Sequence, residues 1–266
     1  AIGKGGEFVF ASEIKSILSS GLINPILDKE SLTHYLKRLY VHPHKTIYKN
    51  IFTLPPAHLL IYKNEKIITE RYWQIPEIKN LITLEEAVPE FKKLLHKAVE
   101  KQLIADVPVG AFLSGGLDSS TIVAIASQYK KGIKTFSFAF RDSINELSFA
   151  REIAQKYGTD HTELCDDKED IGELLLKMAD VYDEPFADSS NVPTYLISKL
   201  ARKHTKVALT GDGGDELLGG YGWYKPFLHF KNKEKKSLLQ FQLLNFLGKL
   251  SARFSFGWQN THQRLK

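Results

Sequence analysis

The hydrophobic pattern divides the chain into two regions with different periodicities. Up to about residue 75, short apolar runs alternate with stretches that contain proline and glycine, which is typical of a β-rich region with a few short helices. The strands predicted there are 8–11, 58–62 and 66–72, and the predicted helices are 13–19 and 30–39. From residue 84 to residue 99 the apolar positions recur at spacings of three and four, which predicts one long amphipathic helix.

Strands and helices alternate after this long helix. The predicted strands are 107–113, 134–140, 160–165 and 206–210, and the predicted helices are 118–131, 146–157, 169–181 and 193–204. Helical crossovers of this length join parallel strands, so the pattern predicts an α/β fold with a doubly wound parallel sheet. A further helix, rich in Leu and Phe, is predicted at 241–254.

Composition narrows the class of protein. Hydrophobic residues make up 43% of the 266 positions, which is enough for a packed core, and no apolar run reaches the length of a membrane span. The single cysteine excludes a disulfide framework and a cysteine-based zinc site. These features predict a cytoplasmic enzyme without a membrane partner.

The net charge of +5 has a local origin. Residues 225–266 hold nine Lys or Arg and one acid, Glu234, so the rest of the chain carries a net negative charge. No RNP-type, zinc-finger or other recognition motif accompanies the basic segment. It is therefore interpreted as a solvated face, and no nucleic-acid partner is predicted.

A turn rich in glycine and serine separates the predicted strand 107–113 from the helix that follows it. In residues 114–120 (SGGLDSS), Gly115 and Gly116 let the backbone turn sharply and bring its N–H groups close to a ligand. The serine hydroxyls and the open helix start add donors, so the segment predicts a phosphate-binding site. Asp118 would repel a phosphate unless a cation such as Mg²⁺ lies between them; the alternative is that Asp118 only caps the helix.

An acidic segment rich in glycine follows the predicted strand 206–210. Residues 211–221 (GDGGDELLGGY) combine five glycines with Asp212, Asp215 and Glu216. A loop that approaches a ligand is favoured over an acidic surface turn, because a turn alone needs only about two residues. Two such loops, each after a strand of one parallel sheet, would face each other at the carboxyl ends of the strands, where ligands of these folds bind.

Together these two loops resemble the motifs of the glutamine-hydrolysing asparagine synthetases, which belong to the PP-loop ATP pyrophosphatases. Residues 183–195 (DEPFADSSNVPTY) resemble the substrate-side segment of that family. The segments that resemble the end of its glutaminase domain are 10–16, 45–51 and 54–58. The resemblance therefore spans most of the chain.

The resemblance implies a domain organisation. Residues 1–78 would be the remnant of a β-rich glutamine amidotransferase domain with a linker, and residues 79–266 a PP-loop synthetase (ATP pyrophosphatase) domain, incomplete at its C-terminus. Cys165 is the only cysteine and Met178 the only methionine, so the family's N-terminal cysteine nucleophile is not in this chain. We therefore expect an excerpt of a longer protein that cannot make ammonia from glutamine by itself. The resemblance leaves open whether the protein forms a homodimer.

The site residues implied by the resemblance fall into four groups. ATP would be held by Leu113, Ser114, Gly115, Gly116, Leu117, Asp118, Ser119, Ser120, Phe138 (against the adenine), Thr210 and Gly211. Mg²⁺ would be shared by Asp118 and Asp215, and the substrate pocket would include Glu184, Asp188, Ser189 and Ser190. Asp212 would be the catalytic acid that helps to arrange the attack of the amine, at a position where the family often has Glu.

The resemblance implies ATP-dependent amide formation, with ATP and Mg²⁺ as cofactors and with aspartate and ammonia as partners. The side-chain carboxylate of aspartate would attack the α-phosphorus of ATP, pyrophosphate would leave, and ammonia would then displace AMP to give asparagine. Charge stabilisation would dominate the catalysis, and no covalent protein nucleophile is required. Two alternatives stay open: a related adenylating amidotransferase that acts on another carboxylic acid, and a non-catalytic nucleotide-binding module.

Overall fold

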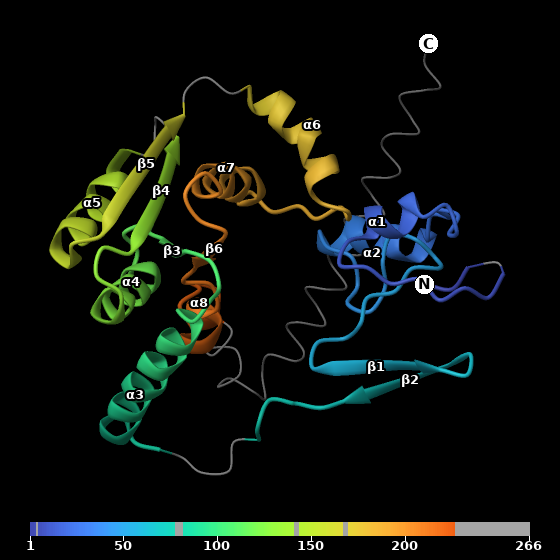
Figure 1. Cartoon of the computed structure of the whole chain (residues 1–266), viewed down its shortest axis with the longest axis horizontal. Coiled ribbons are helices and arrows are strands. Elements are labelled where there is room, and N and C mark those ends of the chain that lie inside the picture. The colour runs from blue at the N-terminus through green and yellow to red at the C-terminus, as the bar shows by residue number, and fades with distance from the viewer. Residues whose placement is uncertain (4, 78–81, 141–143, 167–169, 227–266) are drawn as a thin grey trace, which may run out of the picture. The chain divides into compact units, whose positions relative to one another are not determined.

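The structure is a computed structural model that describes residues 1–3, 5–77, 82–140, 144–166 and 170–226. The chain forms two compact units, Ala1–Thr210 and Gly211–Lys266, and each is considered by itself. The helices of the first unit are α1 (Ile14–Ser19), α2 (Lys29–Arg38), α3 (Leu84–Gln102), α4 (Leu117–Tyr129), α5 (Ile144–Tyr157), α6 (Ile171–Val181) and α7 (Asn191–Ala201). Its strands are β1 (His58–Lys63), β2 (Lys66–Arg71), β3 (Val109–Phe112), β4 (Lys134–Phe140), β5 (Asp160–Asp166) and β6 (Val207–Leu209). The second unit contains α8 (Gly214–Leu218) (Figure 1), and the helix predicted at 241–254 lies outside the described residues.

Four parallel strands form the central sheet of the first unit, in the order β5-β4-β3-β6 (Figure 1). The chain adds β4 and β5 on one side of β3 and then returns to place β6 on the other side. Ala111 in β3 pairs with Thr135 of β4 on one side and with Leu209 of β6 on the other. The predicted α/β fold with a doubly wound parallel sheet is confirmed, and the strand order reverses between β3 and β6.

Helices pack on both faces of this sheet. The core on the α4 and α5 face consists of Ala111, Leu113, Val123, Ala150 and Ala154. On the opposite face, Leu200 and Ala201 of α7 bury the ring of Phe136. Because successive side chains of a strand point to opposite faces, the neighbours of Phe136 in β4, Thr135 and Ser137, point to the α5 face.

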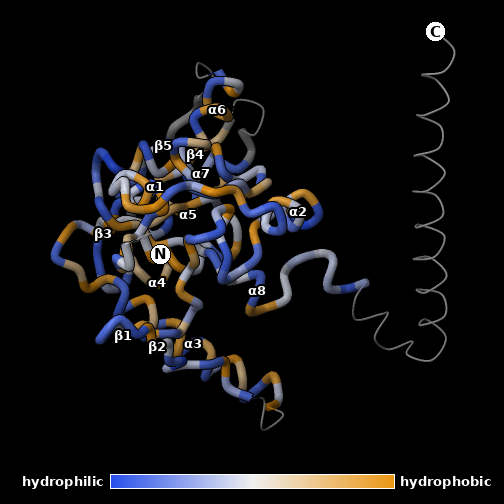
Figure 2. The backbone as a smooth tube through the Cα atoms, turned by 90° about the vertical axis from the view of Figure 1, so that its right-hand side faces the viewer, coloured by the Kyte–Doolittle hydropathy of each residue, from blue (hydrophilic) through white to orange (hydrophobic). Residues whose placement is uncertain are grey.

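Helix α3 confirms the long amphipathic helix that the spacing predicts. It begins with a capping box, in which Thr83 and Glu86 each bond the backbone of the other. Figure 2 shows hydrophobic and hydrophilic positions interleaved along it. Near its end, Val99 packs against Ile125 and Ile133, which ties α3 to α4 and to the start of β4. Among the described helices, none combines the length and the apolar character that a membrane crossing needs.

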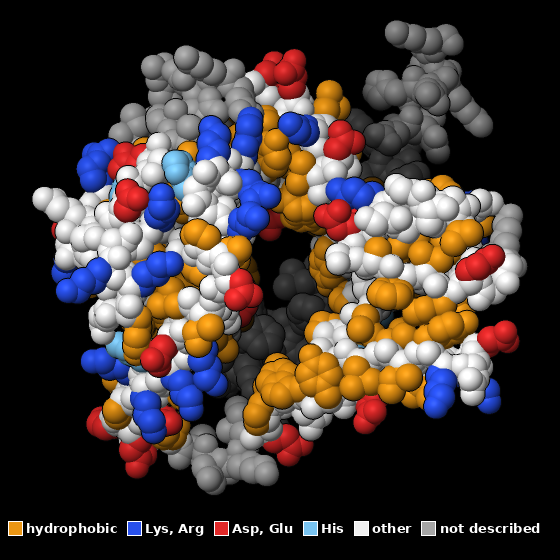
Figure 3. All heavy atoms as spheres, viewed as in Figure 1, with side chains coloured by type: hydrophobic (Ala, Val, Ile, Leu, Met, Phe, Trp, Pro, Cys, Tyr) orange, Lys and Arg blue, Asp and Glu red, His pale blue; other side chains and the backbone are white. Residues whose placement is uncertain are grey.

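The N-terminal part of the first unit contains two short helices and a β-hairpin. Ile17, Ile23 and Ile51 form a small buried cluster beside α1. Strands β1 and β2 pair in antiparallel register, as predicted, and Figure 3 shows hydrophobic side chains gathered on the surface in this region. Ile67 and Ile68 are among those exposed on the hairpin.

The strand predicted at 8–11 is wrong. Phe8 forms only an isolated antiparallel bridge with Ile2, and Val9 donates one hydrogen bond to the carbonyl of Ala1. The chain turns between these two positions, with Gly6 at φ +88°, and within the described residues no further segment extends the pairing. β-Propensity without a partner strand therefore yields a bridge rather than a strand.

Candidate functional site

The turn after β3 packs closely against helix α5. Gly115 adopts φ +83°, a conformation that glycine reaches at little cost. A Cβ at this position would lie 2.6 Å from the Cβ of Phe149 and 2.7 Å from the backbone nitrogen of Ala150. The sequence predicts a sharp turn here, and the structure adds that only glycine fits against α5.

Helix α4 starts directly after this turn and leaves its first N–H groups uncapped by side chains. Gly116 occupies the N-cap position and provides no capping side chain, and Asp118 lies in the first turn. The buried Oγ of Ser120 has no hydrogen-bond partner within the part of the chain that the structure describes. An uncapped helix start with an unpaired buried hydroxyl is chemically suited to bind an anion such as phosphate.

The other two serines of the turn hold its shape. The hydroxyls of Ser114 and Ser119 are 2.9 Å apart, and the Ser119 hydroxyl also accepts a hydrogen bond from the amide of Ser114 at 3.2 Å. The Ser114 hydroxyl accepts from the amide of Gly116, also at 3.2 Å. These bonds fix the turn before any ligand arrives.

The two leucines that flank the turn have opposite environments. Leu113 is fully buried at 0% exposure and packs in the core below α5, so only its backbone is available to a ligand. Leu117 is 81% exposed at the start of α4. The predicted role of Leu113 beside the nucleoside would therefore have to involve its backbone.

Glycines set the backbone conformation of the acidic segment after β6. Gly213 and Gly219 bracket α8 with φ angles of +93° and +69°. The carboxylate of Asp215 folds back against Gly220, where a Cβ would lie 1.9 Å from its Oδ1. The hydroxyl of Tyr221 donates to Glu216 at 2.6 Å, and this bond raises the pKa of Tyr221 to about 12.

The two predicted loops follow neighbouring strands. Since Ala111 pairs with Leu209, β3 and β6 end at the same edge of the sheet, and the acidic segment begins from that edge after Thr210. The sharing of Mg²⁺ by Asp118 and Asp215 stays a prediction, because these residues belong to separate units. Within the described ranges, no three His, Cys, Asp or Glu side chains cluster as ligands of a metal ion.

A local hydrogen bond to the backbone fixes the segment 183–195, which is predicted to contact the acceptor acid. The Oδ1 of Asp188 accepts a hydrogen bond from the amide of Ser190 at 2.8 Å, and this bond lowers the pKa of Asp188. Asp188 and Ser189 line a hollow of about 530 Å³ whose other walls include the apolar Ile171 and Phe186. These residues remain candidates for the substrate pocket.

Glu184 and Asp183 contact the N-terminal part of the same unit. The Oε1 of Glu184 accepts a hydrogen bond from the amide of Ile47 at 2.7 Å, and burial raises the pKa of Glu184. Lys15 donates through Nζ to the carbonyl of Asp180 at 2.8 Å and lies 3.3 Å from the Oδ1 of Asp183. The carboxylate of Glu184 thus already has a protein partner.

Phe138, predicted to lie against the adenine, is half-buried on the α7 face of β4. It packs against the hydrophobic cluster of Leu174, Met178, Val192 and Leu196, which joins α6 to α7. The contact with adenine stays a prediction.

Comparison with known proteins assigns the chain to a family. The asparagine synthase family matches residues 90–265, and the glutamine amidotransferase domain family matches residues 2–73. The chain belongs to the asparagine synthase family. It is 39% identical over 223 residues to the putative asparagine synthetase [glutamine-hydrolyzing] 2 of Methanocaldococcus jannaschii, and 34% identical over 242 residues to asparagine synthetase [glutamine-hydrolyzing] 1 of Bacillus subtilis.

These matches cover most of this member of the family but less than half of each relative. They span 82% and 88% of the chain, and 43% and 38% of the two relatives. Among solved structures, the chain is similar to a glutamine-dependent NAD+ synthetase from Acinetobacter baumannii in complex with ADP, at 20% identity and a TM-score of 0.34. That similarity covers 57% of this chain and 30% of the other.

Sequence reasoning missed several polar residues whose partners lie in distant segments of the chain. Thr135 and Ser137 alternate with phenylalanines in β4, and both are buried. Hydroxyls at every second position of a strand expected to be covered on both faces are the signal that points to bonded partners. Lys15 gives no comparable signal, since its partners Asp180 and Asp183 are far away in the sequence.

Proposed function

We propose that this chain carries the ATP-binding part of a glutamine-dependent asparagine synthetase. The observation that carries the proposal is the uncapped start of α4 behind the Gly115 turn, at the point where the strand order reverses. Ligands of doubly wound sheets bind at such points, and a helix start favours phosphate. Membership in the asparagine synthase family supports the choice of reaction.

In this proposal the turn after β3 binds the pyrophosphate end of ATP. The N–H groups at the start of α4 would donate to phosphate oxygens, and so would the hydroxyl of Ser120, which has no partner among the described residues. Ser114 and Ser119, already bonded to each other, would keep the backbone donors in place. Donors that are fixed in advance stabilise the charge that develops when pyrophosphate leaves.

The acceptor would be the side-chain carboxylate of aspartate. Its oxygen would attack the α-phosphorus of ATP to form an acyl adenylate, and pyrophosphate would leave. Ammonia would then attack the acyl carbon, and AMP would leave with the acyl C–O bond broken, which gives asparagine. Asp212 is proposed to help arrange the attack of the amine.

Asp118 and Asp215 are the residues proposed to hold Mg²⁺. Asp118 lies in the first turn of α4, next to the uncapped N–H groups, where a phosphate-bound cation would meet it. When bound, Mg²⁺ would supply positive charge between the carboxylates and the departing pyrophosphate. Both residues belong to loops that start from the same edge of the sheet.

The division into an amidotransferase part and a synthetase part is proposed near residue 78. The two family matches, residues 2–73 and 90–265, flank this position and support it. The ammonia would come from glutamine in the protein to which the chain belongs.

A related enzyme that adenylates another carboxylic acid is the second candidate. The hollow beside Asp188 and Ser189 favours it, because apolar residues such as Ile171 and Phe186 form much of its wall. Aspartate is small and charged at both ends, so a larger, less polar acid would use such a wall better.

Product analysis separates these candidates. The full-length protein is incubated with Mg-ATP, ammonia and either aspartate or a panel of other carboxylic acids. AMP, pyrophosphate and asparagine in equal amounts, all dependent on aspartate, are the expected result. Release of pyrophosphate that does not depend on aspartate would refute the asparagine reaction. Binding of ATP without turnover on any acid would favour a non-catalytic nucleotide-binding module.

A further inference from the structure

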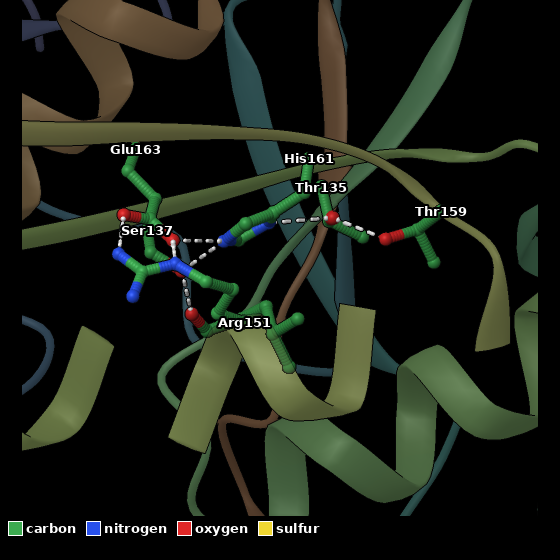
Figure 4. Close-up of polar contacts among 7 residues, drawn as sticks. Thr135, Ser137, Arg151, Thr159, His161 and Glu163 are labelled. Atoms are coloured by element: carbon green, nitrogen blue, oxygen red, sulfur yellow. Dashed lines mark hydrogen bonds and ion pairs between the residues drawn. The ribbon is translucent and has the colours of Figure 1, made fainter. Parts of the chain in front are cut away.

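Polar side chains from β4, β5 and α5 form a network on the α5 face of the sheet (Figure 4). Thr135 and Ser137 come from β4, and His161 and Glu163 come from the paired positions of β5. Thr135 is 0% exposed and Ser137 is 2% exposed. Hydroxyls buried to this extent are destabilising unless they are hydrogen-bonded, so their partners matter.

The Leu113 carbonyl determines which group donates and which accepts in each hydrogen bond of this network. Ser137 bonds the carbonyl oxygen of Leu113, the residue just before the turn. A carbonyl only accepts, so the Ser137 hydroxyl donates to it, and the lone pairs of Ser137 face the Nε2 of His161 at 3.4 Å. His161 must therefore carry its proton on Nε2, which also lies 3.4 Å from the Oε1 of Glu163.

The other nitrogen of the ring completes the chain of donors. Burial lowers the pKa of His161, which favours the neutral ring, so its Nδ1 accepts. Thr135 Oγ1 lies 2.8 Å from this Nδ1 and 2.8 Å from the Oγ1 of Thr159. Thr159 thus donates to Thr135, Thr135 to His161, and His161 to Ser137, with all the donors oriented toward Leu113.

Helix α5 holds the other side of the network. Arg151 donates to both carboxylate oxygens of Glu163, at 3.1 Å through Nε and at 2.7 Å through Nη2. Paired bonds of this kind fix geometry as well as adding energy. Arg151 directly follows Ala150, the residue against which Gly115 is seated. The network therefore reaches the turn at two points, the Leu113 carbonyl and Gly115.

We infer that His161 is a positioning residue for nucleotide binding: through Ser137 it holds the Leu113 carbonyl, and so the turn that follows it, in the conformation that receives phosphate. The inference rests on the proposed function only in assigning ATP to that turn. His161 would not touch the nucleotide, because Ser137 and the backbone of Leu113 lie between them.

A matched control exists at the other end of β3, the strand that leads into the turn. Thr205 is buried and donates through Oγ1 to the carbonyl of Pro108, just before β3 begins. It makes the same kind of hydroxyl-to-backbone bond as Ser137, but it lies at the end of β3 away from the turn. Thr205→Val therefore tests loss of stability without an effect on the turn.

The experiment measures the Kd for Mg-ATP in the full-length protein by calorimetry, without any acceptor acid, and the thermal unfolding of each variant. Ser137→Ala and His161→Phe are expected to raise the Kd about tenfold, since each leaves a buried polar group without its partner. His161→Gln, which keeps one donor and one acceptor, should stay within about threefold of the wild-type Kd. Thr205→Val should lower the melting temperature about as much as Ser137→Ala and leave the Kd within about twofold.

Three results would overturn the inference. These are a wild-type Kd for Ser137→Ala, an increase in Kd for Thr205→Val as large as that for Ser137→Ala, and a His161→Gln variant as weak as His161→Phe. Since aspartate is absent from this assay, failure of the asparagine reaction leaves the result unaffected. A wild-type protein that binds no Mg-ATP would defeat both the inference and the proposed function.

Discussion

The carboxylate of Glu184 and the amide of Ile47 are 137 positions apart in the sequence and 2.7 Å apart in the structure. This bond joins the segment proposed to meet the acceptor acid to a residue within the glutamine amidotransferase match. Burial raises the pKa of Glu184 above its ordinary value of 4.5. Burial of this carboxyl group thus links its protonation to the stability of the fold.

We expect Glu184→Gln to change how stability depends on pH. The raised pKa means that the folded state binds the proton of Glu184 more tightly than the unfolded state does. Its contribution to the free energy of unfolding is therefore complete below about pH 4.5 and declines as the pH rises through the raised pKa. Urea unfolding between about pH 4 and pH 7 should show the variant gaining stability relative to the wild type as the pH rises.

Glu152→Gln, an exposed substitution on α5, serves as the control for this series. Its stability should run parallel to that of the wild type across the same range. Parallel curves for Glu184→Gln as well would mean that the carboxyl group has the same pKa in the folded and unfolded states.

Gly115→Ala should be far more destabilising than an alanine at another left-handed glycine. Both Gly115 (φ +83°) and Gly132 (φ +64°) have positive φ, but at Gly132 nothing lies within 4 Å of a new Cβ. Gly132→Ala should cost about 1 to 2 kcal/mol from backbone strain alone. Gly115→Ala adds the clash with Phe149 and Ala150, so its loss should reach about 3 kcal/mol or more in the free energy of unfolding. Equal losses of unfolding free energy for the two variants would contradict the close packing of the turn against α5.

Asp118→Asn should lower the rate of pyrophosphate release about a hundredfold and raise the Mg²⁺ concentration needed for half-maximal rate. The variant keeps the size and shape of the side chain but removes its charge. Asp106→Asn, an exposed position ahead of β3, is the control and should keep the wild-type Mg²⁺ dependence. If Asp118→Asn matched that control, Asp118 would not be a metal ligand.

Lys15→Met should affect glutamine-dependent synthesis more than ammonia-dependent synthesis. Lys15 lies in the amidotransferase match, and its partners Asp180 and Asp183 lie in the asparagine synthase match. The side chain of Lys15 is 44% exposed, and a partly exposed ion pair contributes about 0.2 to 1 kcal/mol, so we expect a loss of up to about fivefold in the glutamine-dependent rate. The two rates are compared in one preparation, with Lys29→Met, a charge loss on α2, as control. Equal losses of both rates would place the effect of Lys15 in overall stability.

Local patterns predicted much of the fold and the position of the turn. The three- and four-residue spacing of α3 and the alternation of strands with helices depend on neighbouring residues, so the sequence displays them directly. The turn at Gly115 and Gly116 followed from the same local logic, and the structure places it between β3 and α4 as predicted.

Contacts between distant segments could not be predicted in the same way. The bonds of Glu184 with Ile47 and of His161 with Ser137 depend on strand register and on the return of the chain, which no local spacing encodes. The wrong strand at 8–11 has the same cause, because a strand needs a partner as well as propensity.

Strand β3 is anchored at both ends by buried hydroxyls, Thr205 at Pro108 and Ser137 at Leu113. A strand held in this way cannot slide lengthwise past its neighbours, so the surface it presents to an incoming phosphate is set during folding. Binding of an anion would then cost little conformational entropy in this part of the molecule. Because the backbone would not adjust to the ligand, anions would be distinguished by how well their shape fits the fixed turn.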